Sequence, residues 1–206
     1  MSDGPPVDES KRATLRRFAA LGAATPLARL ADARDGGDEG GTDARDAIAG
    51  YLAATPGAHF SKVRDDLKLG NGEAQYHLGQ LLEAGTVESH RDGDYRRFFP
   101  ADRFSEFEKA ALGYLRRETP RGMLVELLSD PDVTARGLAE RLDVSRATVS
   151  KYAGELENAG LLTREDGYVV ERPETVLMLV VRYADSFDAR AARVAGRADD
   201  LVAYDR

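Results

Sequence analysis

The chain has 206 residues, 42% of them hydrophobic, and a formal net charge of −7, which allows one large domain or two small domains with an apolar core. Its longest apolar run, Val176–Val181, is far shorter than a membrane-spanning helix, so we expect no membrane partner. Because cysteine is absent, disulfide frameworks, cysteine-based zinc sites, iron–sulfur clusters and thiol catalysis are excluded.

The types of charged residue are more informative than the net charge. Aspartate outnumbers glutamate by 21 to 15, and only five of the 29 basic residues are lysine. This composition resembles that of proteins from salt-loving archaea, in which an acidic surface keeps the protein in solution. A GC-rich genome is the alternative explanation. In either case the negative charge does not exclude a nucleic-acid partner.

Residues 1–41 are predicted to be a flexible N-terminal segment with one short helix. Prolines at 5 and 6 and glycine pairs at 36–37 and 40–41 are typical of unpacked chain. Between them, Glu9–Arg34 carries Leu15, Phe18 and Leu21 at helical spacing, interrupted by Pro26.

The same segment is similar to a twin-arginine export signal. Arg16-Arg17 precedes a weakly apolar stretch, residues 19–27, and small residues follow at 31–33. Arg29 interrupts the approach to that cleavage site, so we favour a surface or partner-binding helix. Contact with a membrane or with the export machinery is the weaker alternative.

From residue 42 onward the order helix, short helix, turn, helix and hairpin occurs twice. The first copy, residues 42–104, has helices near 42–54, 61–67 and 73–84, and its hairpin turns at Asp92-Gly93. A connecting helix at 105–118 leads to the second copy, residues 119–172, whose hairpin turns at Asp166-Gly167. We call these copies the first and the second repeat.

Over about twenty residues, the two repeats superpose without a gap at an offset of 75 residues. The matched positions are Leu67 and Leu142, Leu69 and Val144, Ala74 and Val149, Leu78 and Ala153, Gly79 and Gly154, Leu81 and Leu156, Ala84 and Ala159, and Gly85 and Gly160. So many coincidences in register indicate an internal duplication.

A short helix, a tight turn and a longer helix form a helix-turn-helix, and the following hairpin adds a wing that reaches the flanking DNA backbone. The stretch Leu142–Lys151 strongly resembles the turn and recognition helix of bacterial and archaeal winged helix-turn-helix regulators. Residues 42–171 as a whole resemble archaeal, haloarchaeal-type tandem winged helix-turn-helix transcriptional regulators. The expected fold is mainly α with small β wings: two tandem winged helix-turn-helix units plus a long C-terminal helix.

The second repeat has the better recognition helix. Arginine can bind guanine through two hydrogen bonds, serine and threonine can bind bases or phosphates, and lysine suits phosphate. Its predicted DNA-binding residues are Ser145, Arg146, Ala147, Thr148, Ser150 and Lys151 on the helix and Arg164 on the wing. Arg146 and Lys151 could instead be ordinary solvated surface residues.

The first repeat has the opposite pattern. Its helix offers the neutral residues Asn71, Gln75 and Tyr76 as DNA contacts, and its wing offers Arg91, Arg96 and Arg97. The alternative is that Arg96 and Arg97 lie on a strand face and pair with nearby carboxylates. The first repeat would then not touch DNA.

The last segment, residues 173–206, is predicted to be a long helix that begins at Pro173. A heptad seam runs through Leu177, Val180, Ala184, Phe187, Ala191, Val194, Ala198 and Leu201. This spacing predicts dimerisation. The alternative is that the helix packs back on the winged units or on residues 9–34.

Together these patterns predict a cytoplasmic, sequence-specific DNA-binding transcription regulator, a homodimer on double-stranded DNA that also contacts the transcription machinery. The main alternative is a winged-helix adaptor in chromosome segregation or with a polymerase, whose helices bind protein. The three histidines are isolated and lack metal-ligand spacing, so that we expect no metal, no cofactor and no enzyme.

Overall fold

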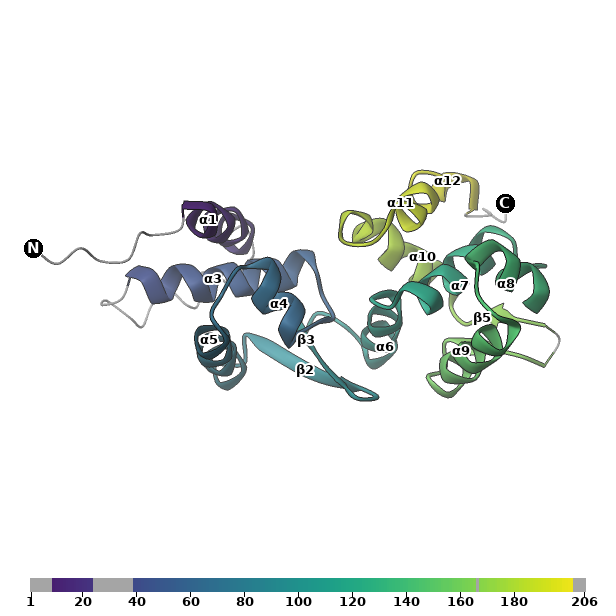
Figure 1. The fold of residues 1–206 in the computed structure, drawn as a ribbon, viewed down its shortest axis with the longest axis horizontal. Helices are drawn as coiled ribbons and strands as arrows, with labels where there is room; N and C mark the ends of the chain where they lie inside the picture. Colours follow the sequence, from purple (N-terminus) through teal and green to yellow (C-terminus); the bar gives the residue numbers. More distant parts are fainter. Residues whose placement is uncertain (1–8, 24–38, 166, 202–206) are drawn as a thin grey trace, which may run out of the picture. The chain divides into compact units, whose positions relative to one another are not determined.

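The computed structural model describes residues 9–23, 39–165 and 167–201, and the chain divides into two compact units (Figure 1). The N-terminal unit is Met1–Arg103 and the C-terminal unit is Phe104–Arg206. Each contains a helix-turn-helix followed by a β-hairpin. This confirms the predicted tandem winged helix-turn-helix fold, mainly α with small antiparallel wings.

The N-terminal unit has four described helices and one small sheet. They are α1 (Glu9–Ala23), α3 (Glu39–Ala54), β1 (Ala58–His59), α4 (Phe60–Asp66), α5 (Asn71–Glu83), β2 (Val87–Asp92) and β3 (Tyr95–Pro100). The described strands pair antiparallel in the order β1-β3-β2, so that β3 lies in the middle.

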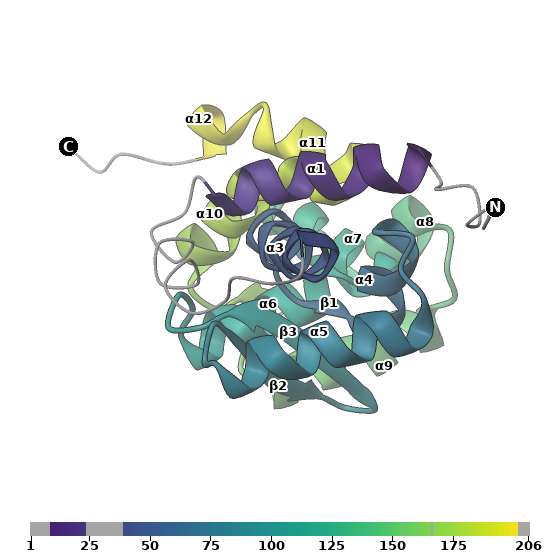
Figure 2. The ribbon, with the colours of Figure 1, turned by 90° about the vertical axis from the view of Figure 1, so that its left-hand side faces the viewer.

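Helix α3 lies at the centre of the core of this unit. Its side chains Ile48, Tyr51 and Leu52 are at most 2% exposed, as the helical spacing predicts. Helix α1 crosses over α3 (Figure 2) and buries Leu15 in the same core. The ring of Phe18 meets that of Tyr51 edge to face, with centroids 5.2 Å apart.

The apolar face of α1 therefore packs inside its own unit, and the expectation that it meets a partner is wrong for this face. Arg16 and Arg17 lie on the exposed side of the helix. The remainder of the predicted helix, residues 24–34, lies outside the described residues.

The C-terminal unit holds the second winged fold and the chain end. Its elements are α6 (Glu106–Leu115), α7 (Glu118–Ser129), α8 (Ala135–Leu142), α9 (Arg146–Asn158), β4 (Leu162–Thr163), β5 (Val169–Val170), α10 (Pro173–Arg182), a 3₁₀ helix η1 (Ala184–Ser186), α11 (Ala189–Ala195) and α12 (Ala198–Leu201). Ser105, Thr134 and Ser145 cap α6, α8 and α9 through side-chain oxygens.

Helix α7 packs against both helices of the helix-turn-helix, α8 and α9. A glycine permits this approach, because a Cβ atom on Gly122 would lie 2.6 Å from Cδ2 of Leu142 at the end of α8. A larger residue at position 122 would therefore force the side chain of Leu142 to shift.

The single long C-terminal helix predicted for residues 173–206 is wrong. Helix α10 ends at Arg182, and the 3₁₀ helix η1 follows. Asp188 is extended, with φ −91° and ψ 174°, and caps α11 with its own side chain. A helix restarted in this way cannot continue the direction of α10, so the heptad spacing does not become one seam.

The residues of that predicted seam are divided between several short helices. Leu177, Val180, Ala191 and Val194 are at most 8% exposed, because α10 and α11 pack on each other and on α6 and α7. Ala184, Phe187, Ala198 and Leu201 are half-buried. The alternative stated from the sequence, in which the segment packs back on a winged unit, describes this arrangement.

Candidate nucleic-acid interface

The turn between α8 and α9 positions the predicted recognition helix. Asp143 ends α8 in a left-handed conformation, φ 54° and ψ 46°, which aspartate tolerates better than most residues. Ser145 then begins α9, and its Oγ accepts a hydrogen bond from the backbone N–H of Thr148 at 3.0 Å. The first turn of α9 is thereby fixed by a local cap.

Helix α9 has one buried side and one side that faces outward. Val149, Ala153 and Leu156 are fully buried. The predicted DNA-binding residues lie on the other side: Ser145, Arg146, Ala147, Ser150 and Lys151 are exposed, and Thr148 is half-buried. An exposed helix face of this size fits the major groove of DNA, which is about 12 Å wide.

Arg146 has no carboxylate partner among the residues that the structure describes. It lines a shallow surface hollow between α8 and α9 together with Arg136. Arg136 pairs with Glu140 one turn later, but both side chains are more than 60% exposed, so the pair contributes little. The sequence analysis missed Arg136 because an Arg–Glu pair at this spacing is common on solvated helices.

The acidic residues of α9 are paired with arginines from other segments. Arg117 Nη1 lies 3.2 Å from Glu155, whose other oxygen is 3.8 Å from Lys151. Arg164 binds Glu157, and its hydrogen bond holds the pKa of Glu157 below the ordinary value. These pairs reduce the repulsion that α9 would exert on phosphate. Arg164 is thus engaged with α9, which makes it a weaker candidate for DNA contact than Arg146.

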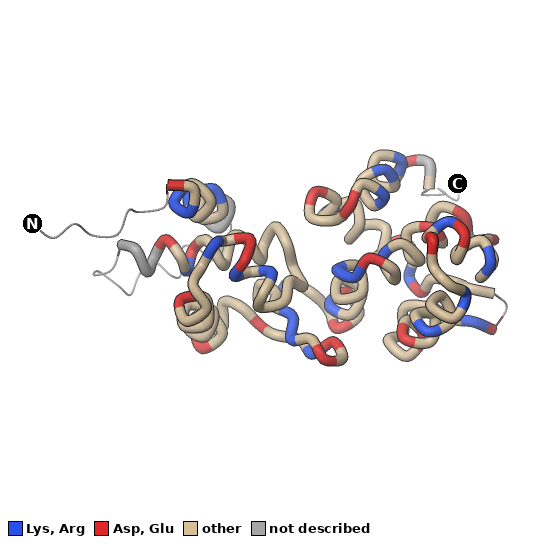
Figure 3. Tube along the Cα trace, in the orientation of Figure 1, with Lys and Arg blue, Asp and Glu red and all other residues tan. Residues whose placement is uncertain are grey.

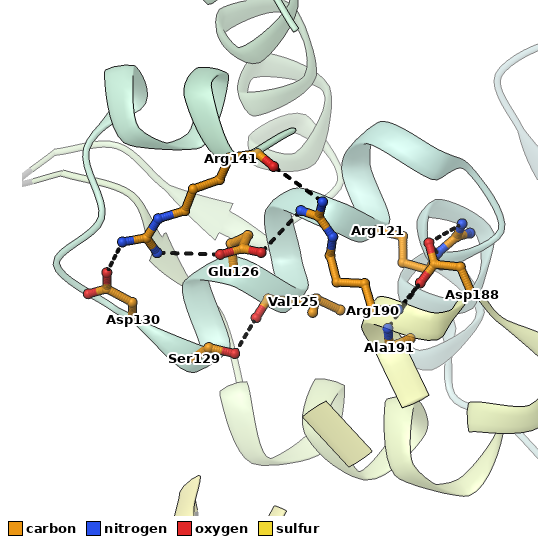
Figure 4. Close-up of polar contacts among 9 residues, drawn as sticks. All are labelled: Arg121, Val125, Glu126, Ser129, Asp130, Arg141, Asp188, Arg190 and Ala191. Atoms are coloured by element: carbon orange, nitrogen blue, oxygen red, sulfur yellow. Dashed lines mark hydrogen bonds and ion pairs between the residues drawn. The ribbon is translucent and has the colours of Figure 1, made fainter. Parts of the chain in front are cut away.

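A cluster of charged side chains holds α8 against α7 and α11 (Figure 4). Glu126 of α7 accepts hydrogen bonds from Arg141 at 3.3 Å and from Arg190 of α11 at 3.0 Å. Arg141 also pairs with Asp130 at 2.6 Å. Arg190 also donates a hydrogen bond, at 3.2 Å, to the backbone oxygen of Arg141. This oxygen lies in the last turn of α8, where the helix dipole favours a cation.

The position of α11 is itself fixed by Asp188. Its carboxylate accepts hydrogen bonds from the N–H groups of Arg190 and Ala191, both at 3.0 Å, and from Arg121 at 2.7 Å. Although partial burial opposes ionisation, the hydrogen bonds from Ala191 and Arg121 lower the pKa of Asp188. No local sequence signal could reveal this cluster, because Arg121 and Asp188 are 67 positions apart.

In the N-terminal unit, the outward side of α5 is neutral to acidic, and Glu83 at its end is exposed. Asn71 accepts a hydrogen bond from Arg64 of α4 at 3.3 Å, and Gln75 is exposed. Tyr76 is 61% exposed, and its hydroxyl accepts a hydrogen bond from Gln80. Since α5 contains no lysine or arginine, this face can hydrogen-bond and stack but cannot neutralise phosphate.

The wing of this unit presents two arginines side by side. Arg91 and Arg96 are directly opposite each other on β2 and β3, so their side chains lie on the same face of the hairpin, and both are exposed. Arg96 donates to Ser89 Oγ at 3.0 Å. Figure 3 shows basic positions on the β2–β3 hairpin next to acidic positions at its tip; Asp94, at the tip, is exposed.

Arg97 is not available to DNA, which corrects the prediction that it binds there. Its side chain is 2% exposed, forms an ion pair with Asp92, and donates to the backbone oxygen of Gly57 at 3.0 Å. The cause is the central position of β3, which places Arg97 between His59 of β1 and His90 of β2. The alternative of pairing with a carboxylate is therefore correct for Arg97, but the strand face is buried, whereas the sequence predicted a solvated one.

No described helix is both long enough and apolar enough to cross a membrane. In the part of the chain that the structure describes, no three histidine, aspartate or glutamate side chains are grouped so that they could hold a metal ion.

Two family models match parts of the chain. A model described as an N-terminal HTH domain, that is, a helix-turn-helix domain, matches residues 42–112. The model of the MarR family matches residues 121–172. No curated protein and no solved structure matches the chain. The two matches support a DNA-binding regulatory protein and point away from an enzyme.

Proposed function

We propose that this protein is a sequence-specific, cytoplasmic DNA-binding transcription regulator whose base readout comes from α9. The observation that carries the proposal is the outward face of α9, where Arg146 is exposed and has no carboxylate partner within the described residues. A guanidinium group in this position can form two hydrogen bonds to the O6 and N7 atoms of guanine.

The wing of the N-terminal unit has a different role in this proposal. Arg91 and Arg96 lie on one exposed face of the β2–β3 hairpin, where they can bind the phosphate backbone without reading sequence. The side chain of Lys151 is 68% exposed, and its ion pair with Glu155 is long, at 3.8 Å. Lys151 can therefore exchange this partner for a phosphate.

The experiment is a DNA-binding titration by fluorescence anisotropy, with the region upstream of the protein's own gene and a scrambled duplex of equal length. Arg146→Ala should lower affinity for the preferred sequence by roughly 1–3 kcal/mol and affinity for the scrambled duplex much less. Arg91→Ala/Arg96→Ala should weaken binding to both duplexes alike. It should also reduce the slope of log affinity against log salt concentration by about 0.9 for each lost phosphate contact. Glu118→Gln, an exposed change at the start of α7, is the control.

A protein-binding adaptor is the second candidate, and the neutral-to-acidic outward side of α5 supports it. If neither the Arg146 variant nor the double wing variant changes DNA binding, the adaptor is the better proposal.

The acidic composition also enters the proposal. We attribute it to a salt-rich, archaeal-type cytoplasm, in which the counterion term of DNA binding is weak. Specific binding then depends on base contacts and on several linked units, which homodimerisation would supply. The titration is therefore run in molar as well as in dilute potassium chloride.

A further inference from the structure

A groove of about 300 Å³ lies in the C-terminal unit beside the wing. Its walls come from the end of α7, the wing strand β5, the start of α10 and the single turn of α12. Most of the lining is aliphatic, including Leu127, Val169, Leu177 and Leu201. This volume and lining are within the range of small-molecule sites in proteins.

The polar groups of the groove define which ligand it fits. Among the described residues, Glu174 is the only charged one that lines the groove, and it has no ion pair with another of them. Tyr168, half-buried at the wing, adds an aromatic ring. A carboxylate and an aromatic ring next to aliphatic walls favour a positive head group attached to an apolar body.

We propose that this groove is a binding site for small organic cations with an apolar body, such as aryl or alkyl ammonium compounds. The apolar body lies against Leu127 and Leu177, and the positive group lies against Glu174. Val169 is 54% exposed at the mouth, and a bound ligand would cover it. The site goes beyond the proposed DNA binding and does not depend on it.

The test is calorimetric titration of the full-length chain without DNA, at constant ionic strength. The probes are benzyltrimethylammonium, the neutral benzyl alcohol and the anionic benzenesulfonate. We expect saturable binding of one benzyltrimethylammonium per chain, weaker binding of benzyl alcohol and no binding of benzenesulfonate.

Two variants locate the site. Glu174→Gln should weaken binding of benzyltrimethylammonium about two- to fivefold and leave binding of benzyl alcohol unchanged. Val169→Trp, which fills the mouth of the groove, should weaken binding of both. The matched control is Glu165→Gln, which removes an exposed carboxylate of the same wing outside the groove lining; it should bind both probes like the wild type. Circular dichroism confirms that each variant is folded.

Three results would overturn the proposal. The first is no saturable binding to the wild-type chain, as would occur if a second copy or the chain's own end fills the groove. The second is a Glu174→Gln variant that binds the cation as well as the wild type does. The third is an equal loss for Glu165→Gln and Glu174→Gln, which would indicate general attraction to an acidic surface.

Discussion

Two adjacent arginines of β3 have opposite environments. Arg96 lies on the exposed face of the hairpin, whereas Arg97 is buried and paired with Asp92. Side chains of a strand alternate between its two faces, so one position decides which arginine can reach a ligand and which supports the wing. The exposed cation and the buried cation are thus neighbours in the sequence.

Replacing Arg97 with alanine should destabilise the N-terminal unit by about 3–5 kcal/mol, because it removes the guanidinium that forms an ion pair with the buried carboxylate of Asp92. Arg96→Ala, on the exposed face, should change the stability by less than about 1 kcal/mol. Urea unfolding followed by circular dichroism measures both. Equal stabilities of the two variants would contradict the burial of Arg97.

His59 couples this unit to pH. Its Nδ1 accepts a hydrogen bond from the N–H of Lys62 and caps α4, which requires the neutral ring. Partial burial, and then the charge of Arg97, lower the pKa of His59. As the pH falls, His59 is therefore protonated in the unfolded chain before it is protonated in the folded chain. The stabilisation that the neutral ring provides is complete above pH about 6.5 and is lost as the pH falls through the lowered pKa.

The unfolding free energy of the wild type should accordingly decrease between pH 7 and pH 5 by more than that of His59→Asn. Asparagine also caps helices, but it does not titrate in this range. Urea titrations at several pH values compare the two proteins. Parallel pH profiles would show that His59 contributes nothing to the pH dependence.

At the scale of the element, α9 depends on helices that follow it in the chain. Arg190 of α11 binds Glu126 and the last turn of α8 (Figure 4). Asp188 in turn holds the first turn of α11 and Arg121. The C-terminal helices are therefore part of the support of the helix-turn-helix rather than a separate dimerisation rod.

Asp188→Ala removes both the cap of α11 and the partner of Arg121, and it should cost about 1–2 kcal/mol of stability. Asp188→Asn keeps a capping oxygen and should cost less. Thermal unfolding of the full chain distinguishes them. Because the pKa of Asp188 is lowered, the charge-dependent part of this difference should disappear in acid, as the pH falls below the ordinary aspartate range. A wild-type melting temperature for Asp188→Ala would contradict the role of this cap.

At the scale of the whole molecule, the proposed homodimer needs a surface at which two chains associate. The proposed homodimer cannot use the heptad seam, since α10, η1, α11 and α12 are separate and half of the seam residues are buried. Sedimentation equilibrium should give twice the chain mass. Ala198→Glu, which introduces a charge at a half-buried seam position, should leave that mass unchanged. Dissociation of this folded variant into monomers would instead support dimerisation through the heptad seam.

Local patterns allowed much of the fold to be predicted. Ser145 is a cap because serine binds the N–H groups at the start of a helix, and Val149 and Leu156 are buried because their spacing follows the helical period. The outward position of Arg146 follows from the same period. The heptad spacing failed because it also fits helices that pack within one chain, and because the cap at Asp188 interrupts the run.

The sequence by itself thus determined the two winged units, the recognition helix and the residues on its outward face, because those features follow from periodicity and capping among near neighbours. The tertiary structure alone decided that Arg97 is buried, that Arg164 and Glu157 neutralise each other, and that the chain end supports α8. Burial and ion pairing depend on which distant segments meet, and the spacing of residues along one segment does not contain that information.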